Sequence, residues 1–253
     1  MSDSIVIIPT YNEKENIEAI IKAVFSLENV FDVLIIDDHS PDGTADIVKS
    51  LQKLYNNRLY LIERSGKLGL GTAYITGFDW CLKNGYTYIF EMDADFSHNP
   101  VDLNRLYETA KENAPSLVIG SRYISGVNVV NWPMGRILMS YYGSAYVRFI
   151  SGIPVRDTTA GFVCYHRQIL EQMHFNQIKM KGYGFQIEMK FYTWKMGYKV
   201  IEIPIIFTDR KQGTSKMSGG ILKEAILGVF KMKLRSWFIK YPKAPLNAKK
   251  NLA

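Results

Sequence analysis

The clearest chemistry in this sequence lies in two carboxylates, Asp93 and Asp95, which a single small residue, Ala94, separates. Side chains alternate between the two faces of a strand, so strand geometry continued through this point directs both acids to the same side. Two like charges side by side favour a bound cation. Mg²⁺ or Mn²⁺, held by one or two carboxylates and completed by substrate phosphates, suits the pair. Solvated turn acids are the alternative, because so short a motif also occurs without metal.

The flanking residues predict how the acid pair is positioned. The apolar, aromatic stretch at 86–92 is typical of a buried strand, and Asn99 followed by Pro100 is a helix-start signal. The acids therefore fall in a tight turn between a strand and a helix. In open α/β sheets, the crevice at the carboxyl ends of the strands is where ligands bind.

The rest of the chain alternates between strand and helix patterns. The run at 4–10 is typical of a central parallel strand covered on both faces. Further strands are expected at 31–36, 59–63, 117–120 and 199–207, and helices at 15–27, 40–54, 69–82 and 136–150. This alternation predicts an α/β fold, a mostly parallel, Rossmann-like sheet with helices on both faces. The second strand also ends in acids, Asp37 and Asp38, after which Ser40 and Pro41 predict a helix cap.

Charge separates the chain into two parts. The formal charge of +7 lies entirely in residues 219–253, which hold eight basic residues and one acidic residue. With 253 residues and 47% hydrophobic content, the chain predicts one domain, 1–218, followed by this basic segment. A basic segment suits an anionic surface, either a membrane or nucleic acid, and a merely solubilising tail is the alternative.

Two segments carry apolar stripes with helical spacing. The first, within 136–151, comprises Ile137, Leu138, Tyr141, Ala145, Tyr146, Phe149 and Ile150. The second, within 219–253, comprises Ile221, Leu222, Ala225, Ile226, Val229, Phe230, Leu234, Trp237 and Phe238. Either stripe can pack into the core or lie in a membrane interface, because both kinds of burial select the same pattern. Basic residues beside the second stripe favour an anionic membrane for it, with core docking as the alternative.

The cysteines and the apolar runs indicate a compartment. Cys81 and Cys164 are isolated, without metal-ligand spacing, which fits a reducing cytosol. No signal peptide pattern opens the chain, and no apolar run approaches the ~18 residues that a membrane span requires. We therefore expect a cytoplasmic protein that is soluble or bound peripherally to a membrane.

Gly69 and Gly71 follow the third expected strand and invite a dinucleotide-binding interpretation. The third glycine of that fingerprint would fall at position 74, which is a tyrosine. A strand-to-helix turn or a loop near phosphate explains these glycines better.

A basic loop follows the last expected strand. Arg210 and Lys216 lie on either side of Gly213, an arrangement suited to gripping a phosphate. Arginine would do so with its planar fork and lysine as a point charge. An exposed basic loop without a ligand is the alternative.

Seven segments in consistent order carry a family resemblance. They are 8–13, 37–44, 69–71, 92–98, 120–123, 182–189 and 210–217. Together they resemble the family 2 glycosyltransferases of the GT-A fold, and within them the dolichyl- or polyprenyl-phosphate mannosyltransferases. The resemblance implies inverting transfer of mannose from GDP-mannose to a polyprenyl phosphate lipid, with Mg²⁺ or Mn²⁺. It also implies the short form of this family, attached peripherally to the cytoplasmic face of a membrane surface.

The resemblance assigns roles to individual residues. Guanosine contacts fall at Pro9, Tyr11, Glu13, Ile36 and Asp38. Contacts to ribose and diphosphate fall at Asp93 and Ala94, and the metal at Asp95 and Ser97. Cations for the acceptor phosphate fall at Arg122, Arg136, Arg210 and Lys216. The residues expected to act in catalysis are Asp95, Arg122, Arg210 and Lys216.

A phosphate acceptor agrees with the residues predicted for the site. A phosphate is already an anion at neutral pH and needs little or no general base, so we expect Glu188 to be structural instead of a base. A sibling transferase that uses UDP-glucose or UDP-N-acetylglucosamine is one alternative. A non-catalytic module that binds a nucleotide or a lipid phosphate is another. We expect no nucleic acid partner, because the aromatic residues of the basic segment lie on its apolar stripe.

Overall fold

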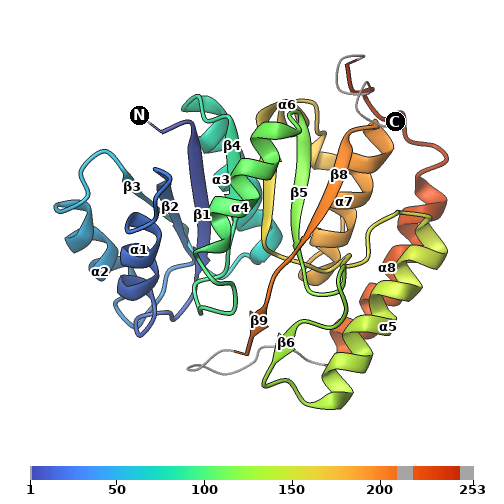
Figure 1. Ribbon diagram of the computed structural model, residues 1–253, viewed down its shortest axis with the longest axis horizontal. Helices are drawn as coiled ribbons and strands as arrows, with labels where there is room; N and C mark the ends of the chain where they lie inside the picture. The colour runs from blue at the N-terminus through green and yellow to red at the C-terminus, as the bar shows by residue number, and fades with distance from the viewer. Residues whose placement is uncertain (1, 210–218, 246–253) are drawn as a thin grey trace.

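The apolar runs form one mixed sheet in the computed structural model, which describes residues 2–209 and 219–245. Within these residues the sheet has seven strands in the order β3-β2-β1-β4-β7-β5-β8 (Figure 1). The strands are β1 (Ser4–Thr10), β2 (Asp32–Asp37), β3 (Leu59–Glu63), β4 (Tyr88–Glu91), β5 (Ser116–Ser121), β7 (Val163–His166) and β8 (Lys199–Pro204). Only β7 runs antiparallel to its neighbours, so the predicted mostly parallel sheet is confirmed for the described chain.

Helices cover both faces of the sheet, as predicted. Ile5 and Ile7 of β1 belong to one buried cluster, and Val6 and Ile8 belong to the cluster on the opposite face. This alternation explains why the strand is apolar throughout. The first face is covered by α3 (Leu70–Lys83), α6 (Arg167–Glu171) and α7 (Tyr183–Met196), and the second by α1 (Ile17–Phe25), α2 (Thr44–Gln52) and α4 (Asp102–Glu112).

Strand β7 was not predicted from the sequence. It pairs with both β4 and β5 and therefore separates them in the sheet. Four residues are too few to establish a period, and the helix α6 follows without an intervening turn signal. The last expected strand, 199–207, is also divided: β8 ends at Pro204, and a two-residue strand, β9 (Phe207–Thr208), pairs with β6 (Val129–Val130).

The acid turn differs from the prediction in its local geometry. Strand β4 ends at Glu91, so strand alternation does not extend to Asp93 and Asp95 and is not what orients them. Helix α4 begins at Asp102, later than the prediction, and the Asn99 side chain accepts a hydrogen bond from the Val101 backbone N–H at 3.2 Å. Asn99 therefore organises the turn ahead of the helix.

The expected helix cap at Ser40 is also wrong. Helix α2 begins at Thr44, whose backbone N–H donates to the Asp42 carboxylate at 3.0 Å. The Ser40 hydroxyl instead donates to Asp37 at 2.6 Å and accepts from the Asn12 backbone at 3.0 Å. Ser40 thus ties the β1 and β2 ends together.

The two glycines after β3 have structural reasons. Gly69 adopts φ +102° at the start of α3, a conformation that other residues rarely adopt. A side chain at Gly71 would come within 2.8 Å of the Phe185 ring on α7, so glycine allows α3 and α7 to pack closely. The strand-to-helix turn is therefore confirmed as an explanation for both.

Helices α5 (Met134–Ser151) and α8 (Gly219–Arg235) lie side by side at one end of the molecule (Figure 1). Val229 and Met232 of α8 are buried against the body of the protein. Lys233 donates to the carbonyl of Ser151 at 2.9 Å, so α8 also caps the carboxyl end of α5. The described part of α8 therefore docks against the core, and its contact with a membrane stays a prediction.

Each predicted apolar stripe is nevertheless split between core and solvent. On α5 the buried residues are Ser144, Val147 and Ser151, which lie outside the predicted stripe, whereas Tyr146 and Ile150 of the stripe are partly buried against the core. Large apolar side chains remain exposed at Met134, Leu138, Tyr142 and Phe149 of α5, Leu227, Phe230 and Leu234 of α8, and Trp237 and Phe238 just after it. We call this set the α5–α8 surface.

Candidate active site

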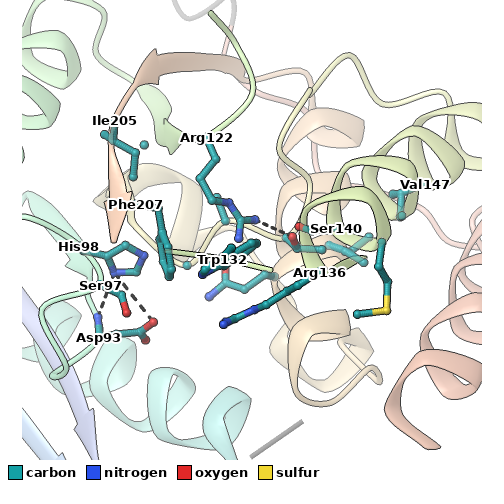
Figure 2. Close-up of a pocket in the computed structure, with 18 of the residues that line it drawn as sticks. Asp93, Ser97, His98, Arg122, Trp132, Arg136, Ser140, Val147, Ile205 and Phe207 are labelled. Carbon is teal, nitrogen blue, oxygen red and sulfur yellow. Dashed lines mark hydrogen bonds and ion pairs between the residues drawn. The ribbon is translucent and has the colours of Figure 1, made fainter. Parts of the chain in front are cut away.

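A pocket opens between the acid turn after β4 and helix α5. Figure 2 shows Asp93, Ser97 and His98 on one side of it, and Arg122, Trp132, Arg136 and Ser140 on the other. The rest of its wall includes residues of α3 and α7, residues 159–161, and Ile205, Phe207 and Val229. The pocket thus joins an acidic end to a basic end, and five predicted site residues line it: Asp93, Asp95, Ser97, Arg122 and Arg136.

The acidic end is a tightly organised turn. The Asp95 carboxylate accepts a hydrogen bond from the Ser97 backbone N–H at 3.0 Å. Phe96 between them has φ +59°, so the chain reverses within two residues. Asp95 and Ser97 are buried, whereas the Asp93 side chain is 42% exposed. The turn therefore brings two carboxylates and a hydroxyl to one pocket without strand geometry.

His98 fixes this turn from behind. Its Nδ1 accepts a hydrogen bond from the Asp93 backbone N–H at 3.3 Å (Figure 2). The His98 ring also stacks on Phe162, with 4.8 Å between the ring centroids. Burial lowers the pKa of His98 to about 4, although the Asp95 charge opposes this shift. The imidazole is therefore neutral at pH 7, which leaves Nδ1 able to accept.

The donor set of the turn fits a divalent ion that a substrate completes. Within residues 2–209 and 219–245, no three His, Cys, Asp or Glu side chains gather as a closed metal site. Mg²⁺ and similar ions are commonly held by one or two carboxylates with substrate phosphates and water as further ligands. Asp93 and Asp95, with the Ser97 oxygen beside them, supply such an open set.

The basic end is built around a buried ion pair. Arg122 donates from Nε and Nη2 to the two carboxylate oxygens of Asp157, at 2.7 and 2.6 Å. Burial alone would raise the pKa of Asp157, but the charge and hydrogen bonds of Arg122 hold it below its ordinary value. Arg122 also donates to the Thr159 hydroxyl at 2.8 Å. It therefore fixes the 157–159 loop while its guanidinium lines the pocket.

Aromatic rings surround the two arginines. The Arg122 guanidinium lies 5.2 to 5.5 Å from the ring centroids of Tyr123, Trp132 and Phe207. The Arg136 guanidinium lies 4.0 Å above the Trp132 ring and forms an ion pair with Asp209 at 2.9 Å. Both charges are held by cation–π contacts in addition to their acids. The β6 and β9 strands bring Trp132, Phe207 and Asp209 to this position.

Comparison with known proteins decides the family. The family model for "Glycosyl transferase family 2" matches residues 5–174. This chain is a family 2 glycosyltransferase. It is 42% identical over 232 residues to the polyprenol monophosphomannose synthase of Mycolicibacterium smegmatis, covering 92% of this chain and 87% of that protein. It is 43% identical over 223 residues to the undecaprenyl-phosphate mannosyltransferase of Micrococcus luteus, covering 88% and 90%.

Solved structures place this glycosyltransferase in the GT-A fold. Glucosyl-3-phosphoglycerate synthase from Mycobacterium tuberculosis, in complex with Mn²⁺, UDP-glucose and glycerol 3-phosphate, superimposes with a TM-score of 0.68. The match covers 90% of this chain and 79% of that chain at 15% identity. At this identity the likeness concerns the fold, and the predicted fold class is confirmed.

The residues that the resemblance assigns to guanosine do not line the pocket. Pro9 and Ile36 are register partners at the ends of β1 and β2, and Tyr11 and Glu13 follow in the next loop. The Ile36 side chain is fully buried in the core, so only its backbone can meet a ligand. Ala94 is likewise buried. These assignments stay predictions.

Asp38 has a partner that the sequence did not reveal. Arg64, just after β3, forms an ion pair with Asp38 and also donates to the Thr72 hydroxyl and the Gly69 carbonyl. The two side chains are 7% and 9% exposed, so the pair is nearly buried. Asp38 therefore anchors the turn into α3, and any nucleotide contact that it makes is shared with this role.

Two predicted phosphate ligands, Arg210 and Lys216, lie outside the described residues. Glu188, by contrast, is placed clearly. Its carboxylate accepts from the Lys179 and Met180 backbone N–H groups, each at 2.7 Å, and forms an ion pair with Arg235 of α8. Glu188 does not line the pocket. The structural role expected for it is confirmed by these contacts.

Several pocket residues escaped the sequence analysis. Asp157, Thr159, Tyr74 and Gln186 line or support the site, but none was assigned a role there, although Gln186 lies in the family segment 182–189. Trp132 was visible only as an aromatic residue ahead of the α5 helix. A lone polar or aromatic residue carries no signal of its own until the fold supplies its partner.

Proposed function

We propose that this chain transfers mannose from GDP-mannose to a polyprenyl monophosphate, with inversion at the anomeric carbon. The observation that carries the proposal is a single pocket that joins a carboxylate turn to two arginines. A nucleotide diphosphate with its metal suits the first, and an acceptor phosphate suits the second. The names of the two relatives at 42% and 43% identity support the same donor sugar and acceptor class.

The carboxylates in the pocket support a phosphate acceptor. Asp93 and Asp95 are the acids on its wall, within the described residues, and both belong to the turn assigned to the donor. A sugar hydroxyl as acceptor would call for a general base near the basic end. There the described wall offers Arg122, Arg136, Ser140 and Thr159 instead. An acceptor phosphate is already an anion, so it needs cations to bind it more than it needs a base to deprotonate it.

The chain would promote the reaction mainly by positioning. Arg136 presents its guanidinium from the start of α5, and Arg122 is held by Asp157, so an acceptor phosphate is directed toward the acid turn. A divalent ion bound at Asp93, Asp95 and Ser97 would neutralise charge on the departing diphosphate. Arg210 and Lys216 remain proposed cations for the phosphates. Apolar side chains such as Ile205, Phe207 and Val147 limit water in the pocket.

A polyprenyl phosphate acceptor would lie in a membrane, so the protein would have to reach a membrane surface. We propose that the α5–α8 surface rests on the cytoplasmic face of a membrane, with the chain bound peripherally. Phe149, Trp237 and Phe238 are 87%, 68% and 86% exposed, as side chains that enter a lipid interface would be. None of the helices in the described residues has the length and hydropathy to cross a membrane. Segment 219–253 would add basic residues that attract anionic lipids.

The test is incubation of the pure protein with GDP-mannose, Mg²⁺ or Mn²⁺ and a polyprenyl phosphate. We expect lipid-linked mannose, and we expect its formation to stop when EDTA removes the ion. Parallel reactions contain UDP-glucose or UDP-N-acetylglucosamine. Product from a UDP-sugar alone would replace the proposed donor by that of a sibling transferase.

A thermal-shift comparison of GDP and UDP gives an independent readout, since a bound nucleotide stabilises the folded state. We expect the larger shift with GDP. Binding of nucleotide or lipid without turnover of any donor would support a non-catalytic module and contradict the enzyme proposal.

A further inference from the structure

A buried polar cluster lies directly behind the pocket wall. It consists of Glu91 at the end of β4 and Gln186 and Lys190 of α7, which are 0%, 2% and 0% exposed. Gln186 Nε2 donates to the Glu91 carboxyl at 2.6 Å, and Lys190 donates to Gln186 Oε1 at 3.2 Å. Of the three, Gln186 lines the pocket. The cluster therefore reaches the site through one side chain.

The ionisable side chains of Glu91 and Lys190 are both fully buried, which is unusual for charged groups. Burial raises the pKa of Glu91 and lowers the pKa of Lys190, and each group partly offsets the shift of the other. Lys190 also donates to the carbonyl of Ala160, another residue that lines the pocket, at 2.7 Å. Apolar residues of similar volume often stabilise a core as well as a buried ion pair does. Packing alone therefore does not explain the cluster.

The cluster fixes the orientation of the Gln186 amide. A lysine ammonium can only donate, so the amide oxygen must face Lys190 and the nitrogen must face Glu91. A carboxamide has two N–H donors and two acceptor lone pairs, and each neighbour uses one. One donor and one acceptor are left on a side chain that borders the pocket. A hydroxyl group, which donates and accepts at once, is the complement of that pair.

Tyr74 supplies a second polar group on the same wall. Its side chain lines the pocket from α3 and is fully buried, and its hydroxyl has no hydrogen-bond partner among the described residues. Burial raises its pKa well above the ordinary value, so the hydroxyl keeps its proton. The neighbouring residues of this wall, Leu70 and Ile187, are apolar. Two polar groups on an apolar wall suit a ligand that carries several hydroxyls.

We infer that Gln186 recognises a hydroxyl of the hexose on the nucleotide sugar, with Tyr74 beside it and Glu91 and Lys190 as positioning residues. This inference rests on the proposed function, because the hexose must lie between the acid turn and the two arginines. Glu91 precedes Asp93 by two residues, so the amide adjoins the turn assigned to the diphosphate. Gln186 thereby becomes a specificity-determining residue, and its orientation depends on groups that touch no substrate.

The experiment compares binding of GDP-mannose with binding of GDP by calorimetry, for wild type and Gln186→Leu. An unmade hydrogen bond to a hydroxyl predicts about tenfold weaker binding of GDP-mannose. Binding of GDP, which lacks the hexose, should stay within about twofold. The matched control is Gln177→Leu, because Gln177 accepts a hydrogen bond from Tyr192 and does not line the pocket. This control should bind both ligands as wild type does.

The positioning residues are tested by sugar discrimination. The double variant Glu91→Gln and Lys190→Met removes both groups that fix the amide of Gln186, because an amide at position 91 can donate or accept and a thioether at position 190 cannot donate. We expect the ratio of kcat/KM for GDP-mannose over GDP-glucose to fall several-fold, with GDP binding unchanged. A purely structural role would alter stability and leave this ratio constant. If Gln186→Leu fails to fold, Gln186→Asn keeps the amide and withdraws it by one methylene.

Each outcome decides one question. Equal losses for GDP and GDP-mannose, or no loss for either, would overturn the role of Gln186. If the wild type binds no GDP-mannose, the proposed donor is wrong, and the same comparison is made with UDP and UDP-glucose. A loss confined to the sugar nucleotide would then still support Gln186. No difference in either pair of ligands would overturn the inference irrespective of the donor.

Discussion

The two ends of the pocket are built in opposite ways. At the acidic end, the side-chain hydrogen bonds that shape the turn join residues that are close in sequence: Ser97 donates to Asp95, and Asp93 donates to His98. At the basic end the partners are distant, since Arg122 pairs with Asp157 and Arg136 pairs with Asp209, 35 and 73 residues away. A local turn can be recognised from the sequence, whereas a long-range pair needs the fold.

The two ends of the pocket also differ in how their charges are balanced. The acid turn brings two carboxylates to the wall of the pocket, where the proposed divalent ion would neutralise them. The basic end already contains acids for its arginines, so its charges are partly balanced before any substrate binds. We therefore expect changes at the acidic end to affect turnover, and changes at the basic end to affect stability as well.

The largest effect should come from Asp157→Asn, which leaves Arg122 buried without its charge partner. Breaking a buried pair in this way typically destabilises a protein by about 3–5 kcal/mol. The free energy of unfolding from urea titration measures it. Asp79→Asn is the control, because Asp79 pairs with Lys83 on the surface of α3. A loss below about 1 kcal/mol would mean that the pair is no stronger than an exposed one.

The same pair predicts a pH dependence. Because Arg122 holds the pKa of Asp157 below its ordinary value, the ionised carboxylate stabilises the folded state above an unfolded pKa of about 3.9. This contribution should be lost as the pH falls below that value. The difference in stability between wild type and Asp157→Asn should therefore shrink under acid conditions, and a constant difference would contradict the assignment.

The next largest effect should come from Asp95→Ala. Loss of a group that organises a charged transition state commonly reduces turnover by about 10²–10³-fold. The hydrogen bond that Asp95 accepts from Ser97 lies within its own turn, so the thermal unfolding midpoint should change little. Initial rates with GDP-mannose across a range of Mn²⁺ concentrations are the measurement. Near-normal rates in a folded variant would remove Asp95 from the metal site.

A smaller effect is expected for Arg136→Ala at the opposite end. Its side chain is 22% exposed and pairs with Asp209, so stability should hardly change. One charge-assisted hydrogen bond to the acceptor phosphate predicts an acceptor KM about tenfold higher. The KM for the donor should stay constant. Arg105→Ala is the control, since Arg105 pairs with Asp102 away from the pocket. An equal rise in both KM values would contradict a role confined to the acceptor.

The smallest effect on chemistry should come from the double variant Trp237→Ser and Phe238→Ser. Both side chains are largely exposed, so turnover of a short, water-soluble acceptor should match wild type. Flotation with anionic vesicles should fall, because buried apolar area drives interfacial binding. Unchanged flotation would mean that the α5–α8 surface does not contact the membrane. The corresponding control is Leu54→Ser, an exposed apolar residue after α2.

Residue type and spacing were sufficient to predict the structure wherever residues close in sequence define it. The buried strand β1, the α3 turn at Gly69 and the acid pair before α4 are all recorded in residue type and spacing. Burial on both faces makes a strand apolar throughout, and a positive φ selects glycine. The family motifs could also be recognised from the sequence, because they gather at the carboxyl ends of these strands.

Only the tertiary structure decided which distant residues meet. Sequence periodicity records that a residue is buried, but it does not record its partner. The insertion of β7 between β4 and β5, the Arg122–Asp157 pair and the placement of Glu91 beside Lys190 all depend on strand order. For the same reason, the stripe on α5 did not reveal which side would face solvent. The sequence by itself determined the chemical groups of the site, and packing determined their charges, orientations and partners.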